Sequence, residues 1–251
     1  MRFLELLWFS AYAELKAESA RSYLGFLWWL LEPAMFMAVF YVVFGVLLGN
    51  TSPDFIPFLL IGLTFWQWFK SCVTHGSFAI WLNIPLMRQV RLPILLFPLT
   101  AVLSDTLKFF FIFAVLLLLL WLNGRPVTMS YLALPAVFLV ELLLASGCAL
   151  LAAAIVPFVP DVRFVIENAL MALMFMSGVV FSLDTLPEPY RTWMSWNPVV
   201  GVLESARDVL MRGEWPDWGL LAQSTIGAIV LLLAGSTIIV KLSPRYPKLA
   251  V

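Results

Sequence analysis

The chain has 251 residues, of which 63% are hydrophobic and 12% are charged, and its formal net charge is zero. Soluble domains carry about 25% charged residues, so this composition excludes an ordinary soluble domain and predicts an integral membrane protein. The basic residues form no block, which excludes a nucleic-acid partner.

Residues 1–21 predict an amphipathic helix that lies in the membrane interface. Its apolar side carries Leu4, Trp8, Tyr12 and Leu15. Acidic residues interrupt the segment and no short apolar core leads to a cleavage site, so we expect it to stay on the mature protein. Two interpretations remain open for this helix, a simple membrane anchor and a cytoplasmic surface that contacts a partner protein.

Six apolar stretches follow, and each predicts a transmembrane helix because about 20 apolar residues cross the roughly 30 Å hydrocarbon layer. The predicted spans are 24–48, 55–72, 99–122, 131–156, 164–183 and 218–240. The expected fold is an all-α integral membrane protein with six transmembrane helices, forming one domain over 1–251. Too little sequence remains outside the spans for a catalytic domain, and we predict no catalytic residue.

Basic residues near the span ends favour an orientation with both termini in the cytoplasm, since cytoplasmic loops carry the excess of Lys and Arg. That side carries Arg2, Lys16, Arg21, Arg88, Arg91, Arg163, Lys241, Arg245 and Lys248. The opposite side carries fewer basic residues, namely Arg125, Arg191, Arg207 and Arg212.

Aromatic residues crowd the first two spans beyond what two interfacial belts need. Ring faces suit the C–H surfaces of sugars as well as lipid or neighbouring helices. One interpretation is therefore lipid contact or helix packing, and the other is a substrate channel. The candidates for the channel wall are Trp28, Trp29, Phe36, Phe40, Trp66, Trp68 and Phe69.

The segment 83–98, NIPLMRQVRLPILLFP, joins the second and third spans and contains three prolines and two arginines. Prolines oppose a long uninterrupted helix, so we expect a structured cytoplasmic turn. A featureless loop is the alternative, because arginine at the end of a span is common.

Ionisable residues inside or near the spans cost a few kcal/mol each in lipid, so we expect each to face protein, water or an opposite charge. They are Glu32, Lys70, Asp105, Lys108 and Glu141. Asp105 and Lys108 are three residues apart on one predicted helix, a spacing that permits a local ion pair. The two cysteines and the single histidine show no metal-ligand spacing, so we predict no metal site and structural roles for all three.

The segment 184–215 forms the predicted outer loop. Asn197 followed by Pro198 predicts a helix N-cap and a proline at the first helical position, and Gly213 predicts the helix end. We expect the face opposite the apolar stripe to carry charged residues at spacings of three and four that allow pairing, namely Glu204, Arg207, Asp208 and Arg212. This short helix cannot span the bilayer, and we expect it to dip into or lie on the outer leaflet.

Four stretches together resemble the membrane subunits of ATP-binding-cassette exporters of polysaccharide and polyol phosphate. RSYLGFLWWLLEP, at residues 21–33, resembles the opening of these permeases, and 83–98 resembles their cytoplasmic segment. Residues 160–163, PDVR, resemble their turn before span five, although many relatives place a basic residue directly before the aspartate. SLDTLPEPYRTWMSWNPVVGVLESARDVLMRG, at 182–213, resembles their outer loop, so that the resemblance covers nearly the whole chain.

The resemblance implies a half-transporter of the O-antigen, capsule or teichoic-acid export type in the cytoplasmic (inner) membrane. Two copies would form the path for a lipid-linked glycan, and two separate ATPase subunits would bind ATP and Mg. The chain itself has no phosphate-binding Gly-x-x-x-x-Gly-Lys-Ser/Thr motif, so we expect no cofactor on it. Coupling to the ATPase would involve the first helix and Asn83, Leu86, Arg88, Arg91, Pro93, Asp161 and Arg163.

Three other functions are alternatives. An exporter of the same class could carry a lipid, a drug or another small molecule. An integral-membrane glycosyl or acyl transferase would need Glu32, Asp105, Glu141 or His75, but these residues are scattered singly and form no acid-base cluster. A structural scaffold would show no dependence on nucleotide.

Overall fold

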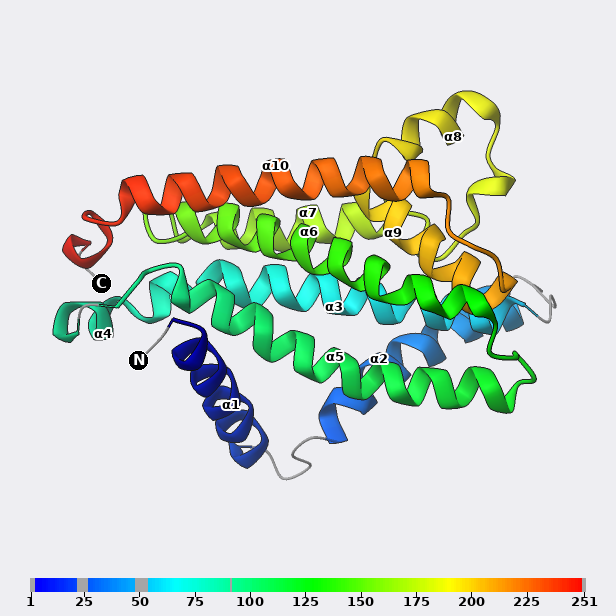
Figure 1. The fold of residues 1–251 in the computed structure, drawn as a ribbon, viewed down its shortest axis with the longest axis horizontal. Helices are drawn as coiled ribbons and strands as arrows, with labels where there is room; N and C mark the ends of the chain where they lie inside the picture. The colour runs from blue at the N-terminus through cyan, green and yellow to red at the C-terminus, as the bar shows by residue number, and fades with distance from the viewer. Residues whose placement is uncertain (1–2, 22–26, 48–53, 91, 250–251) are drawn as a thin grey trace.

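The computed structural model describes residues 3–21, 27–47, 54–90 and 92–249. Four long helices run side by side along the molecule (Figure 1): α3 (Phe55–Leu82), α5 (Leu96–Leu122), α6 (Leu134–Ile155) and α10 (Trp218–Leu242). Both termini and α4 (Ile84–Gln89) lie at one end of this bundle, and α8 (Glu188–Ser195) and α9 (Pro198–Arg207) lie at the other.

Within the described residues, four helical segments are long and apolar enough to cross a membrane. They are α3, α5, α10 and the segment Met129–Ile155, which joins the short η2 (Met129–Ala133) to α6. The described residues contain no β-strand, and the all-α class is confirmed. The helix α3 runs past the predicted end of its span at 72 and reaches Leu82, because no proline lies between residue 72 and Pro85.

The first and fifth predicted spans correspond to shorter helices. The first contains α2 (Leu27–Phe40), which continues as the π-helix η1 (Tyr41–Leu47). The fifth contains α7 (Val162–Met176), whose 15 residues cover only about 22 Å. The count of six crossings therefore stays a prediction.

Two glycines allow α6 and α10 to pack with close backbones. A Cβ at Gly147 of α6 would lie 2.8 Å from Cβ of Leu231, and a Cβ at Gly235 of α10 would lie 2.8 Å from Cβ of Leu150. Lipid tails are as apolar as the helices, so association in a membrane relies on such close packing at small residues. The reciprocal glycines thus fix the register of this helix pair.

An aromatic core joins α3, α5 and α6. Trp68 of α3 stacks on Phe109 of α5 with ring centroids 3.9 Å apart, and its indole N–H donates to the Thr106 hydroxyl at 3.2 Å. Phe138 of α6 meets Phe109 edge to face at 5.6 Å. Because the indole N–H has a partner, the ring is buried without an unsatisfied donor.

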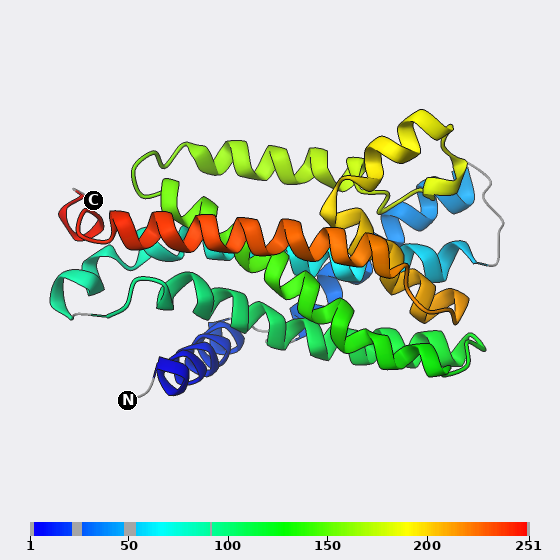
Figure 2. The same ribbon diagram turned by 45° about the horizontal axis from the view of Figure 1, so that its top comes forward.

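The N-terminal helix α1 (Phe3–Arg21) packs on α5 rather than lying apart from the bundle (Figures 1 and 2). Ala11 is fully buried there, whereas Leu4, Trp8 and Tyr12 of the predicted apolar side are exposed. Leu15 of the same predicted side is half-buried, so the helix does not turn its predicted apolar side as a whole toward the protein.

Short helices complete the fold. They are η3 (Leu183–Thr185), the π-helix η4 (Asp208–Arg212) after α9, and η5 (Tyr246–Lys248) near the C-terminus. The buried hydroxyl of Tyr246 donates to the carbonyl of Ala154 at 3.2 Å, which ties the C-terminal segment to the end of α6.

Candidate translocation site

The helix α9, at the end of the bundle opposite α4, begins and ends as predicted. The Asn197 side chain accepts a hydrogen bond from the backbone N–H of Val199 at 3.1 Å, and Pro198 occupies the first helical position. The helical segment ends at Gly213, which has a left-handed φ of 72°. Asn197 also donates to the Ser177 hydroxyl at 2.9 Å, so the cap joins α9 to the residue that follows α7.

Arg207 is fully buried, and the expectation that it decorates an exposed face is wrong. Its guanidinium donates to the carbonyls of Gly178 and Val179 and to the Glu204 carboxylate, each at 2.9 Å. It also lies 3.5 Å from the ring centroid of Phe58 on α3. Burial lowers the pKa of Arg207 to about 10, so the side chain stays protonated at neutral pH.

The reason for this burial lies in the backbone beyond α7. The turn at Gly178, with φ of 65°, leaves two carbonyls inside the protein, and buried carbonyls require donors. A Cβ at Gly62 would lie 2.5 Å from a guanidinium nitrogen of Arg207, so this glycine provides the space. The sequence signalled only the local Glu204–Arg207 pair, because the other partners are distant in the chain.

A cavity of about 520 Å³ lies under α1, and a second cavity of about 490 Å³ lies between α3 and α7. The α3/α7 cavity contains one of the predicted intramembrane charges, Lys70, and the predicted channel residue Trp66. Its lining residues are Leu63, Trp66, Gln67, Lys70, Thr74, Glu167, Leu170, Met171 and Met174. The mixture of an indole, amide, hydroxyl and charged groups within apolar walls can bind a polar solute with C–H surfaces, such as a sugar.

The outer surface of α7 beside this cavity is uncovered within the single chain. Phe164, Val165, Met171, Phe175 and Met176 are all exposed large apolar residues. This face is largely apolar, with Asn168 exposed among these residues, and such a face is a sign of contact with lipid or with another protein.

Three predicted channel residues are buried in the packing core of the single chain: Trp66 and Trp68 are each 3% exposed and Phe69 is 1% exposed. Trp66 also lines the α3/α7 cavity, whereas Trp68 and Phe69 do not. Trp28 on α2 is 47% exposed. The side chains of Trp29, Glu32, Phe36 and Phe40 lie outside the described residues.

The predicted coupling residues lie at the end of the bundle that carries both termini. Asn83 ends α3 and donates to the carbonyl of Ala79 at 2.8 Å, and Leu86 on α4 is exposed. Arg88 donates to the carbonyls of Pro247, at 3.0 Å, and Leu249, so it ties α4 to the C-terminal segment.

The remaining coupling residues flank α7 and the loop after α4. Asp161 precedes α7, and the guanidinium of Arg163 lies 4.4 Å from the Phe164 ring centroid. Pro93 lines a pocket of about 300 Å³ together with Pro247 of the C-terminal segment. Figures 1 and 2 place the turn before α7 at the same end of the bundle as α4. Arg91 lies outside the described residues.

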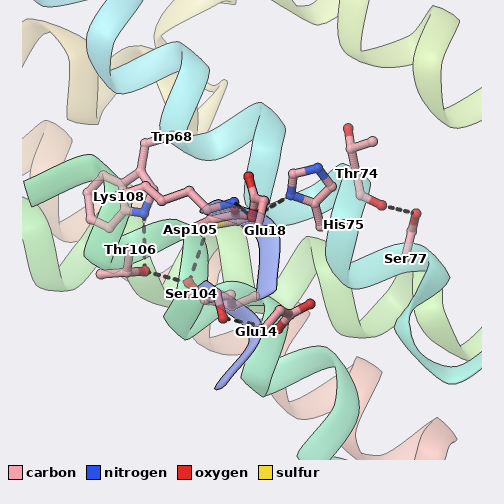
Figure 3. Close-up of polar contacts among 12 residues, drawn as sticks. Glu14, Glu18, Trp68, Thr74, His75, Ser77, Ser104, Asp105, Thr106 and Lys108 are labelled. Atoms are coloured by element: carbon pink, nitrogen blue, oxygen red, sulfur yellow. Dashed lines mark hydrogen bonds and ion pairs between the residues drawn. The ribbon is translucent and has the colours of Figure 1, made fainter. Parts of the chain in front are cut away.

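A polar cluster joins α1, α3 and α5 (Figure 3). Lys108 Nζ lies 3.1 Å from Asp105 Oδ1, which confirms the predicted local pair, and 2.5 Å from Glu18 Oε2. His75 Nδ1 lies 2.7 Å from Asp105 Oδ2, and the Ser104 hydroxyl donates to Glu14 at 3.0 Å. This cluster was not predicted, although Glu14 and Glu18 on α1 have the same spacing of four as Ser104 and Lys108 on α5.

Glu141 of α6 lies in the core with 1% exposure, as expected for a charge kept from lipid, and its Oε2 has no partner among the described residues. Within the described residues, no group of three or more His, Cys, Asp or Glu side chains could hold a metal ion.

Comparison with known families decides the class of this membrane protein. The model of the ABC-2 type transporter family matches residues 5–211, which include both cavities, the coupling segment and α9. The chain belongs to the ABC-2 type transporter family. Family membership identifies the chain as a membrane transport subunit and agrees with its several apolar helices.

Individual relatives are similar along nearly their whole length. The O-antigen export system permease protein RfbA of Myxococcus xanthus is 30% identical over 90% of this chain and 87% of the relative. The protein of the same name from Klebsiella pneumoniae is 24% identical over 94% and 91%, respectively. The polysialic acid transport protein KpsM of Escherichia coli is 27% identical over 88% of each chain.

Proposed function

We propose that this chain is the channel-forming transmembrane subunit of an ABC exporter that moves a lipid-linked polysaccharide across the cytoplasmic membrane. ATP and Mg bind to a separate ATPase subunit, whose hydrolysis drives transport. The observation that carries the proposal is the α3/α7 cavity, whose polar groups and indole lie beside an uncovered apolar helix face. The names of the relatives support polysaccharide as the substrate.

A second copy of the chain completes the path. The exposed apolar face of α7 borders the cavity, so contact between two such faces would cover the apolar surface and enclose the polar groups between the copies. In this proposal Trp28 and Trp66 contribute rings to the wall. Many weak ring contacts hold a glycan without the deep binding well that would stall a moving polymer.

The ATPase subunit docks at the end of the bundle where both termini, α4 and the turn before α7 lie, so both termini are cytoplasmic. Leu86 offers an exposed apolar contact there, and Asp161 and Arg163 offer charged ones. Arg88 acts indirectly, because it holds α4 against the C-terminal segment. Movement of the docked ATPase would then displace α3 through Asn83 and α7 through its first turn, and each helix would move as a rigid body.

The test is to delete the gene for this chain in its native cell, restore it in tagged form, purify it gently and identify stoichiometric partners. The proposal expects an equimolar ATPase with vanadate-sensitive turnover, and loss of surface polysaccharide with accumulation inside the deleted cell. If the purified complex contains no ATPase in any mild detergent, or if surface polysaccharide is unchanged by deletion, the proposal is wrong.

A further inference from the structure

The C-terminal segment, residues 243–249, lies at the end of the bundle that carries α4 and the turn before α7 (Figures 1 and 2). It follows α10 directly, and Pro244 and Pro247 prevent that helix from continuing. A backbone hydrogen bond from Arg245 to the carbonyl of Leu242, at 2.9 Å, turns the chain into η5. The segment is therefore a wound part of the bundle rather than a free tail.

Tyr246 anchors the segment to the end of α6. Its side chain is fully buried, and its hydroxyl donates to the carbonyl of Ala154 at 3.2 Å. The N–H of Phe158, which would continue the helix by donating to Ala154, donates to the carbonyl of Ile155 instead. The Tyr246 hydroxyl thus satisfies a carbonyl at a helix end, where such groups need partners from outside the helix. Its ring also packs against Phe158 in the turn before α7, with ring centroids 5.3 Å apart.

Arg88 joins the same segment to α4. Its guanidinium donates to the carbonyl of Pro247 at 3.0 Å. The helix α4 has six residues, too few to be stable alone, so its orientation depends on its contacts with the rest of the protein. Its buried side chains, Ile84 and Met87, belong to the same apolar cluster as Tyr246.

These contacts connect two elements that the proposed function places against the ATPase. The segment is bonded to α4 through Arg88, and it is packed on the turn before α7 through Tyr246 and Phe158. It also continues α10, which packs closely on α6 at Gly147 and Gly235. A displacement of α4 is therefore transmitted to the turn before α7 and to the α6/α10 pair.

We propose that residues 243–249 couple α4 to the turn before α7, so that the two elements move as one unit; the inference rests on the proposed function. Arg88 and Tyr246 are positioning residues of this link. Without the link, a push on α4 would displace α3 alone through Asn83. With the link, the same push also displaces α7, so both walls of the α3/α7 cavity move in one step.

Hydrogen exchange of the purified full chain tests the link without transport. Tyr246→Phe keeps the ring and removes the hydroxyl donor, and Arg88→Met keeps the length of the side chain and removes its donors. We expect each variant to exchange about fivefold faster both in α4 and in residues 156–161, the factor that corresponds to the roughly 1 kcal/mol of one hydrogen bond. Lys248→Gln, exposed on the same segment, is the control and should change neither element. Faster exchange only in the element that the substituted residue bonds overturns the inference.

A second experiment tests whether the link serves transport. The buried hydroxyl of Tyr246 cannot touch the ATPase, so Tyr246→Phe should retain equimolar ATPase and its vanadate-sensitive hydrolysis. Surface polysaccharide, measured at equal membrane abundance, should fall about fivefold by the same free energy. A purely stabilising hydroxyl would lower the melting temperature and the amount of bound ATPase together with export.

The outcomes separate this inference from the proposed function. Wild-type export by Tyr246→Phe and by Arg88→Met would overturn the inference and leave the export function standing. A complex without any ATPase would overturn the proposed function, and the exchange experiment would still decide whether the segment links α4 to the turn before α7.

Discussion

Arg207 shows how one buried side chain can join α3, α9 and the turn after α7. Its guanidinium donates hydrogen bonds to the two carbonyls that follow α7 and to the Glu204 carboxylate. It also lies over the ring of Phe58. Removing one partner of a buried charged network is far more costly than removing an exposed charge, because the groups left behind stay buried without partners.

Arg207→Gln should therefore destabilise the protein by about 3 kcal/mol. Thermal unfolding in detergent, followed by loss of the monodisperse peak on size exclusion, measures the effect. Arg191→Gln on the exposed surface of α8 is the matched control and should change little. Equal melting temperatures for the two variants would refute the role assigned to Arg207.

Substitution of Trp28 tests whether this residue belongs to the proposed channel wall. Its ring is exposed, so removing the ring leaves no large internal void. Trp28→Ala should slow polysaccharide export severalfold without lowering the amount of protein in the membrane. Trp121→Ala, with a similarly exposed ring of 46% on α5, should export normally. Equal export by both variants would remove Trp28 from the channel.

At the scale of helices, the α6/α10 pair depends on two reciprocal glycines. Gly147→Ala would bring a Cβ to 2.8 Å from both Cβ of Leu231 and the backbone N of Leu232. Relieving this contact requires a shift of the α10 backbone, which strains the helix pair. We therefore expect the free energy of unfolding to fall by about 1–3 kcal/mol. Gly227→Ala, whose Cβ would lie 3.5 Å from Pro198, is the control and should be tolerated in the same melting assay.

The short helix α4 is the element that we expect to transmit force from the ATPase. Leu86→Asp places a charge on its exposed apolar contact and should weaken ATPase docking by about 2 kcal/mol. Co-purification of the ATPase with the tagged chain measures the loss. Leu122→Asp, at the opposite end of the bundle, should leave the complex intact, and loss of the ATPase from both variants would point to general misfolding.

Local patterns in the sequence predicted elements well, and contacts between distant elements poorly. The cap at Asn197 and the pair of Asp105 with Lys108 involve neighbours in the chain, and both were predicted. The burial of Trp68 and the partners of Arg207 depend on helices far apart in sequence, and hydropathy does not encode which face of an apolar helix meets protein. The same limit explains why the α1 cluster was missed.

At the scale of the whole molecule, the proposed dimer predicts that the α7 helices of the two copies lie in contact. Phe175→Cys should form a disulfide-linked dimer in oxidised native membranes, because the two uncovered α7 faces would meet. Ile226→Cys, on an exposed position of α10, should stay monomeric on a non-reducing gel. Cross-linking through position 226 and not through 175 would place the interface elsewhere.

The contacts of α1 set a condition on any movement of this helix. Ala11 is buried against the protein, Glu18 pairs with Lys108, and Glu14 accepts a hydrogen bond from Ser104. A departure of α1 from α5 during a transport cycle must therefore break an ion pair and a hydrogen bond together. The helix is held as much by polar contacts as by apolar packing, so water or a partner that offers replacement polar groups at α5 would release it.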